Sequence, residues 1–269
     1  MTNEPSPLFE QIAADTWMPD TFATGPFSGL QGGGVAGLLC APIEKNATAE
    51  DLGVPASVVT NFVRPAPRSA IQVSVQVLKR GQRVSLLQAD AFSEDKMIAT
   101  QRVTFMRPIS LSFQLEPYGG QTANPATLPE RPHDRIHKAE WMWTAMDVRQ
   151  DSGEQVWFRL KRPVCPDATP YSSALPAADW AHGLTSPVGT IDRPMAMRPN
   201  TDVMVHFIRA PQGSWIGLHP ETLWGLSGAG MGYAALCDTT GVFGRVSMSV
   251  AVTPMESTEA RTAFATAFA

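Results

Sequence analysis

The chain has 269 residues, of which 43% are hydrophobic and 17% are charged, values that are ordinary for a globular protein of one large domain or two moderate ones. Its net charge of -4 gives no electrostatic reason to bind nucleic acid or an anionic membrane surface. No apolar run is long enough to span a bilayer, so we expect neither a nucleic-acid partner nor a membrane span.

The first half of the chain predicts one helix followed by strands. Its opening residues, "MTNEPSPLFEQ", lack the basic and apolar regions of a signal peptide, so we expect a cytoplasmic protein. Apolar residues recur at helical spacing in "QGGGVAGLLCAPIEK", residues 31–45, which predicts a buried helix. Apolar and polar residues alternate within 70–92, which predicts two strands and a turn, and 96–106 predicts a third strand.

A segment rich in Pro, Gly, Asn and Thr follows these strands and indicates a linker. We therefore predict an N-terminal unit over 1–115, a linker over 116–138 and a C-terminal unit over 139–269. The C-terminal unit is predicted to hold strands within six segments, 140–150, 156–164, 201–210, 214–225, 231–241 and 242–252.

An internal repeat relates the two halves. The sequence Phe-x-Arg occurs at Phe62 and again at Phe207, 145 residues later. The same offset aligns two further pairs of segments, 99–108 with 244–254 and 32–39 with 177–184. Because the apolar helix of each half needs a surface to cover it, we expect a curved antiparallel sheet around each helix. That is the hotdog arrangement, and two copies make a double hotdog of the α+β class.

The three cysteines, Cys40, Cys165 and Cys237, are far apart and form no CxxC pair. Their apolar surroundings predict small buried side chains rather than a disulfide framework or a zinc site. No histidine pair has the spacing of metal ligands, so we predict no metal and no cofactor.

Four segments carry a resemblance to a known family: "ATGPFSGLQGGGVAGLL", "AADWAHG", "RPNTDVMVHFIRAPQGSWIGL" and "GAGMGYAALCDTTGVFGRVSMSV". Together they resemble acyl-CoA thioesterase II-type double-hotdog proteins, and the resemblance extends from about Pro19 to Pro254. It implies a tandem hotdog, with two curved antiparallel sheets each wrapping a central helix. It also implies an acyl-CoA substrate that is hydrolysed to free acid and CoA.

The resemblance implies three site residues in the second half, which together position a water against the thioester carbonyl. Asp179 matches the family's carboxylate, and Asn200 matches its Asn or Thr at a strand start. The family's Gln falls on Met248, whose thioether cannot orient a water as an amide can. This departure predicts that catalysis is weaker, rearranged or absent.

The residues themselves leave alternatives open at each of these positions. In apolar surroundings the pKa of Asp179 should rise and make it a better base, but an Asp at a helix start can also be only a cap. Asn200 fits a turn, and Met248 fits strand packing. His182 lies on the same helical face as Asp179 and either shares the proton transfer, replaces the missing Gln or makes a structural contact, which is the favoured interpretation.

Four further residues are predicted to contact the substrate: Gly33, Gly34, Trp180 and Thr201. Close helix-to-sheet packing is the alternative explanation of the two glycines. Under the 145-residue offset Gly34 aligns with Asp179, so the first half is expected to lack a carboxylate at its own, degenerate site.

The leading function is an acyl-CoA thioesterase in which a carboxylate activates water. The alternatives are a non-catalytic acyl-CoA or lipid-binding double hotdog and, less favoured, an enoyl-CoA hydratase-like hotdog that would need an Asp–His pair. Exposed edge strands of such sheets pair readily, so we expect a homodimer.

Overall fold

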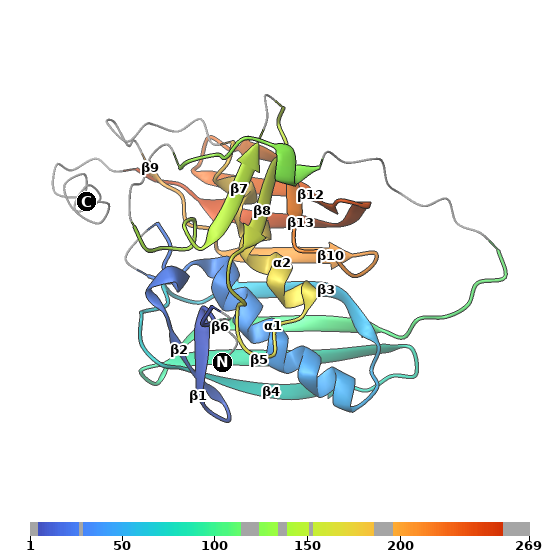
Figure 1. Cartoon of the computed structure of the whole chain (residues 1–269). Helices are drawn as coiled ribbons and strands as arrows, with labels where there is room; N and C mark the ends of the chain where they lie inside the picture. The colour runs from blue at the N-terminus through green and yellow to red at the C-terminus, as the bar shows by residue number, and fades with distance from the viewer. Residues whose placement is uncertain are drawn as a thin grey trace.

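The computed structural model describes residues 5–26, 29–113, 124–133, 139–150, 153–185 and 196–254. Most of the described chain forms one large antiparallel sheet with two α-helices against it, which confirms the α+β class (Figure 1). Within these ranges, no helix combines the length and apolar character needed to cross a membrane.

The first half contains seven helices and strands of the main fold and one short 3-10 helix. In chain order they are β1 (Phe9–Ala13), β2 (Thr16–Pro19), η1 (Thr21–Ala23), α1 (Gly32–Ala49), β3 (Val54–Phe62), β4 (Ile71–Lys79), β5 (Val84–Ser93) and β6 (Lys96–Met106). The predicted helix and the predicted strands are confirmed, while β1, β2 and β3 were not predicted.

The second half repeats this pattern with a shorter helix. Its elements are η2 (Pro125–Thr127), β7 (Met146–Gln150), β8 (Val156–Leu160), α2 (Pro170–Ala178), η3 (Asp179–His182), β9 (Ala196–Met197), β10 (Asp202–Phe207), β11 (Ile216–Trp224), β12 (Ala229–Asp238), β13 (Gly241–Ala251) and β14 (Thr253–Pro254). All six predicted strand segments are confirmed. Part of the predicted linker, including 114–123, lies outside the described residues.

The strand order of the large sheet reads alike from either end. It is β1-β2-β4-β5-β6-β3-β10-β13-β12-β11-β8-β7, so each strand of the first half has a counterpart at the same distance from the centre. At the centre β3 and β10 pair antiparallel, with Asn61 opposite Asp202 and Ser57 opposite His206. The two sheets that were predicted are therefore continuous with each other, because these backbone hydrogen bonds join both halves into one sheet.

The 145-residue repeat is confirmed in the strands. The bounds of β4, β5 and β6, moved by 145 residues, are the bounds of β11, β12 and β13. The arginines of the two Phe-x-Arg sequences also play one role: Arg64 donates to the carbonyl of Met97, and Arg209 donates to the carbonyl of Gly241, 2.9 Å away. Each arginine thus ties its strand to the last hairpin of its own half.

The helices do not follow this offset, and the predicted alignment of 32–39 with 177–184 is wrong. Thr169 caps α2 in a capping box with Ser172, and Pro170 occupies its first turn, so the helix begins at residue 170. It ends at Ala178, where the chain tightens into η3. The second helix therefore stops where the offset would have it start.

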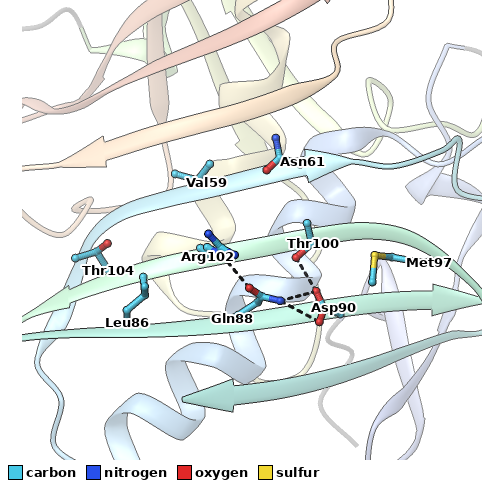
Figure 2. A pocket seen from close by; sticks show the side chains of 9 residues that line it. All are labelled: Val59, Asn61, Leu86, Gln88, Asp90, Met97, Thr100, Arg102 and Thr104. Carbon is cyan, nitrogen blue, oxygen red and sulfur yellow. Dashed lines mark hydrogen bonds between the residues drawn. The ribbon is translucent and has the colours of Figure 1, made fainter. Parts of the chain in front are cut away.

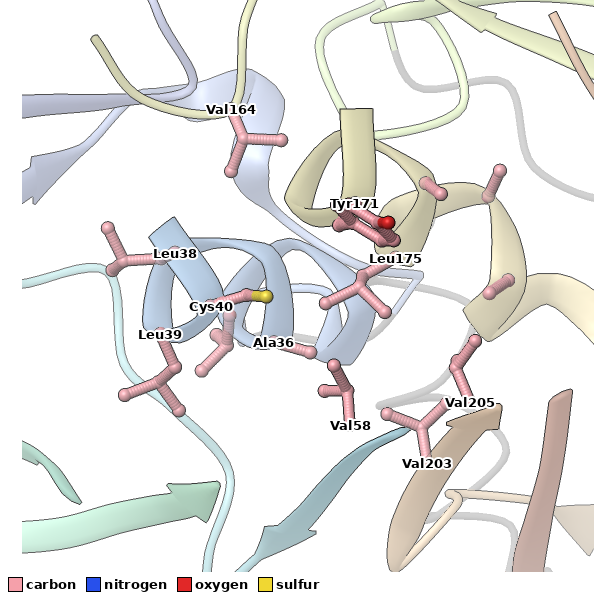
Figure 3. Packing of buried hydrophobic residues seen from close by; sticks show 14 of the residues in the cluster. Ala36, Leu38, Leu39, Cys40, Val58, Val164, Tyr171, Leu175, Val203 and Val205 are labelled. Atoms are coloured by element: carbon pink, nitrogen blue, oxygen red, sulfur yellow. The ribbon is translucent and has the colours of Figure 1, made fainter. Parts of the chain in front are cut away.

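Both helices lie against the same apolar interior. Figure 3 shows side chains of α1 meeting strands from both halves, Val58 of β3 and Val203 and Val205 of β10, with Tyr171 and Leu175 of α2 beside them. The hydrophobic core is therefore continuous across the two halves. The three cysteines are free and buried, as predicted, and burial raises the pKa of Cys165 and Cys237 to about 12, so their thiols stay protonated.

The opposite face of the sheet carries a hollow of about 610 Å³ in the first half (Figure 2). Its lining alternates along the strands with buried core residues, as Leu86 and Gln88 alternate with Leu87 and Ala89 on β5. Arg102, Gln88 and Asp90 form a hydrogen-bonded polar row across it. This hollow faces away from α1 and from the candidate catalytic residues.

Candidate active site

Asp179 is buried between the two helices, with 4% of its surface exposed. It follows the last residue of α2 and begins η3, so it lies at the C-terminal end of its helix. The idea that Asp179 caps a helix N-terminus in its own half is therefore wrong. The helix start that it faces belongs instead to α1, in the other half of the chain.

Two side-chain amides hydrogen bond to this carboxylate, one on each oxygen. Asn200 Nδ2 donates to Oδ1 over 2.7 Å, and Gln31 Nε2 donates to Oδ2 over 2.8 Å. The backbone N–H of Gly33 also faces the carboxylate and favours its charged form. The structure thus brings together the predicted pair, Asp179 and Asn200, with a third group that the sequence analysis missed.

Gln31 reaches Asp179 because it is the N-cap of α1. Its Oε1 accepts the N–H of Gly34 over 2.6 Å, which leaves Nε2 to donate to Asp179 and, over 3.2 Å, to the carbonyl of Pro176. A polar residue directly before a glycine-rich helix start was the signal available in the sequence. Its partner lies 148 residues away, which no local pattern records.

The glycines at the start of α1 let the two helices approach closely. A Cβ on Gly33 would lie 2.5 Å from Asp179 Cβ and 2.5 Å from the carbonyl oxygen of Leu175. On Gly37 it would lie 2.8 Å from the carbonyl oxygen of Ser172. Helix-to-helix packing therefore explains Gly33 and Gly37, and the expected helix-to-sheet contact occurs instead at Gly32, where a Cβ would lie 2.8 Å from the ring of Phe62 in β3.

His182 contacts the site through the backbone. Its Nδ1 lies 3.0 Å from the carbonyl oxygen of Asp179 and 3.1 Å from Met248 Sδ. Burial lowers the pKa of His182 and raises that of Asp179, so burial disfavours the charged form of both. Met248 is 2% exposed and packs beneath η3, which is the structural alternative weighed for it.

The two other residues predicted to contact substrate lie on opposite sides of this group. Trp180 is buried in an aromatic cluster, with its ring 5.0 Å from that of Trp143 and 5.8 Å from that of Trp141. Thr201 is exposed beside Asn200 at the start of β10, and its hydroxyl donates to Asp202. Trp180 therefore belongs to the core, while Thr201 lies at the surface next to the site.

A second buried carboxylate occupies the matching place at the other end of the helix pair. Glu44 of α1 faces the start of α2, where the N-cap hydroxyl of Thr169 lies 2.7 Å from both carboxylate oxygens. Thus Glu44 of α1 meets the N-cap side chain of α2, and Asp179, directly after α2, meets the N-cap side chain of α1. The first half therefore has a buried carboxylate, Glu44, at a different position from Gly34, with which the offset aligns Asp179.

Burial raises the pKa of Glu44 to about 7, against an ordinary value of 4.5, despite hydrogen bonds from Thr169 and Cys40. Between these two values the unfolded chain loses its proton while folded Glu44 keeps it, so stability falls as the pH rises. In the wild type we expect the free energy of unfolding to fall by on the order of 3 kcal/mol between pH 4.5 and 7 because of this group. In Glu44→Gln this fall should be absent. Chemical denaturation across this range measures it.

Glu10→Gln, on an exposed position of β1, is the control and should keep the wild-type pH dependence. Equal pH dependence in wild type and Glu44→Gln would mean that Glu44 ionises normally in the folded protein.

The comparisons with known proteins bear on the fold first. The structure resembles acyl-CoA thioesterase II from Mycobacterium marinum with a TM-score of 0.67, 16% identity, and coverage of 93% of this chain and 96% of that one. A hot dog fold protein of unknown function from Alicyclobacillus acidocaldarius matches with a TM-score of 0.65, 15% identity, and coverage of 90% and 95%. Both matches span nearly the whole of both chains, so the fold is that of hotdog proteins.

A search among curated proteins gave no match. Two family models match in order along the chain: the acyl-CoA thioesterase N-terminal domain over residues 23–106 and the acyl-CoA thioesterase C-terminal domain over residues 114–252. The second alone covers more than half of the chain. By this match, the chain belongs to the acyl-CoA thioesterase family.

Proposed function

We propose that this chain is an acyl-CoA thioesterase and that Asp179 is the base that activates water. The observation that carries the proposal is a buried carboxylate that receives an amide hydrogen bond on each oxygen and faces the N-terminal start of α1. In an ordinary core such a group would be costly, and a buried carboxylate with a raised pKa is suited to take a proton near neutral pH.

The carboxylate keeps one acceptor position for a water molecule. A carboxylate offers about four acceptor positions, and Asn200, Gln31 and Gly33 account for three of them. A water that donates to the remaining position would attack the thioester carbonyl carbon while Asp179 takes its proton. The tetrahedral intermediate then expels the CoA thiolate, which is protonated to the thiol, and leaves the free acid.

The developing oxyanion needs hydrogen-bond donors close to the base. Among the described residues, the N–H of Gly32 has no acceptor, and it lies in the first turn of α1 beside Asp179. A helix start favours negative charge because its free N–H groups and its dipole both point toward it. We propose that Gly32 N–H donates a hydrogen bond to the oxyanion. Asn200 and Thr201 would lie where the substrate enters the site.

The proposal includes the tandem hotdog, with units over 1–115 and 139–269 and a linker over 116–138. The matching strand order around β3 and β10 supports it, as does the 145-residue repeat of three strands in each half. The sheet ends at β1 and β7. Residues 129–131 hydrogen bond along β7, and β1 is bonded beyond the sheet at Phe9, to Val164, so the rest of β1 is the edge that favours pairing in a homodimer.

A non-catalytic acyl-CoA-binding protein is the second candidate, because Met248 leaves β13 without the amide that the family resemblance implies there. The hydratase alternative has less support, because His182 Nδ1 contacts the backbone carbonyl of Asp179, whereas the carboxylate of Asp179 is held by Asn200 and Gln31.

Thiol release from short-, medium- and long-chain acyl-CoAs distinguishes these functions. We expect release of free CoA thiol from at least one chain length. Acyl-CoA binding without thiol release would favour the binding protein, and loss of enoyl absorbance without thiol release would favour the hydratase.

A further inference from the structure

The amide that is absent from β13 has a structural substitute at the other end of the chain. We propose that Gln31, the N-cap of α1, is the positioning residue that holds Asp179 for catalysis, so that the active site is assembled from both halves. This inference rests on the proposed function. It explains how a site with methionine at position 248 can still be complete.

The hydrogen bonds of Gln31 fix its orientation. Its Oε1 accepts from Gly34 N–H over 2.6 Å, so its amide cannot flip without losing that bond. Its Nε2 is therefore held toward Asp179 Oδ2, 2.8 Å away, with a second acceptor at the carbonyl of Pro176. Gln31 is 4% exposed, so water does not compete freely for this amide.

Each oxygen of the Asp179 carboxylate accepts a hydrogen bond from a different side-chain amide. Asn200 takes Oδ1 and Gln31 takes Oδ2, which fixes the plane of the carboxylate and restricts the direction from which a water can approach. Met248 does not take part in this group, because its sulfur lies against His182 Nδ1. Of the three outcomes expected for a chain with Met248, a rearranged site is the one that these contacts favour.

The helix pair supplies a matched control for the loss of stability that removal of the Gln31 N-cap should cause. Thr169 is the N-cap of α2, and its hydroxyl meets the buried carboxylate of Glu44 as Gln31 meets Asp179. Gln31→Leu and Thr169→Val each remove an N-cap and one side-chain donor to a buried carboxylate. Both should lower Tm to a similar degree, but only Gln31→Leu removes a donor from Asp179.

The readout that separates positioning from stability is the pH dependence of kcat/KM for thiol release. A donor to a carboxylate favours its charged form, so Gln31→Leu should raise the pKa of Asp179 and move the acid limb about one pH unit upward. Below that limb kcat/KM should fall about tenfold, because one pH unit is a tenfold change in the charged fraction. Thr169→Val should leave the limb in place.

Met248→Gln gives a second, independent measurement. If Gln31 supplies the amide, a new amide at position 248 should not raise kcat, and a tenfold rise would overturn the inference. An acid limb that is the same in Gln31→Leu and wild type would also overturn it.

Asp179→Asn, measured in the same assay, shows whether a negative result rules out only the role of Gln31 or also the proposed role of Asp179 as the base. If Asp179→Asn is inactive while Gln31→Leu behaves as wild type, only the role of Gln31 is lost. If Asp179→Asn keeps full activity, the proposed base itself is wrong.

Discussion

Asp179→Asn is expected to reduce thiol release from acyl-CoA by at least about a hundredfold. General-base catalysis contributes about 10²- to 10⁴-fold to rate, and an amide cannot take a proton from water at neutral pH. The fold should survive, because asparagine has nearly the same volume and shape as aspartate. Steady-state kinetics with the best acyl-CoA found for the wild type measures the loss, which should appear in kcat.

The substitution also exchanges one acceptor for a donor in a buried group. One of the two amides, that of Gln31 or Asn200, would then face another N–H. We expect this mismatch to lower Tm modestly, since a buried polar atom without its partner costs about 1–3 kcal/mol. Activity should therefore be compared at a temperature well below the Tm of the variant.

Asp202→Asn is the matched control. Asp202 lies two residues from Asn200 at the start of β10, but its carboxylate accepts from Ser249 N–H and Thr201 and not from the site amides. We expect it to keep activity within about threefold, as for a surface substitution away from the reacting groups. If Asp179→Asn loses no more activity than Asp202→Asn, another group must activate the water.

The strands could be predicted from sequence because each carries its own local signal. The alternation of apolar and polar residues in 70–92 and 96–106 is what burial of one face of β4, β5 and β6 requires. β3 was missed because its buried positions include Thr60 and its outward positions include Val59, which blurs the alternation. The joining of the halves was missed because strand pairing between β3 and β10 leaves no trace in either segment.

In the site, too, residues that belong to a recognisable segment were predicted, and residues whose partners are distant in sequence were missed. Asp179 and Asn200 were found through the family resemblance, and their 2.7 Å contact agrees with a shared role. Gln31 and Glu44 were not found, because their significance depends on two helices, one from each half, that pack side by side in opposite directions. The repeat offset also misplaced the second helix, because a capping box, which the offset ignores, decides where α2 begins.

Gly33→Ala is expected to be the most damaging small substitution in the site. The new methyl group would lie 2.5 Å from the carbonyl oxygen of Leu175 and 2.9 Å from the Cα of Pro176, and neither backbone atom can move without shifting α2. Overpacking of this kind costs about 1–3 kcal/mol, and the contact with backbone places it at the upper end. For a chain of this size we expect Tm to fall by about 5–10 °C.

Activity should fall as well, because the methyl group would also lie 2.5 Å from Asp179 Cβ. Pushing α1 and α2 apart moves the carboxylate away from Gln31 and from the helix start that we assign to the oxyanion. A misplacement of about 1 Å can cost on the order of a hundredfold in rate. Thermal denaturation and thiol release on the same preparation measure both effects.

Gly34→Ala is the control that separates the contact between the helices at Gly33 from the general effect of replacing a glycine in α1. It lies one residue along the same helix turn, but the only close approach of its methyl group would be to Met142 Cε, 2.8 Å away at the far end of a flexible side chain, while Gln31 Oε1 and the ring of Phe9 would lie at an ordinary contact distance of 3.6 Å. Alanine also favours a helix over glycine by about 1 kcal/mol, so we expect Gly34→Ala to keep its stability within about 1 kcal/mol of wild type. Equal behaviour of the two variants would mean that contact between the helices at Gly33 does not hold the site together, since helix propensity is the one property that both substitutions share.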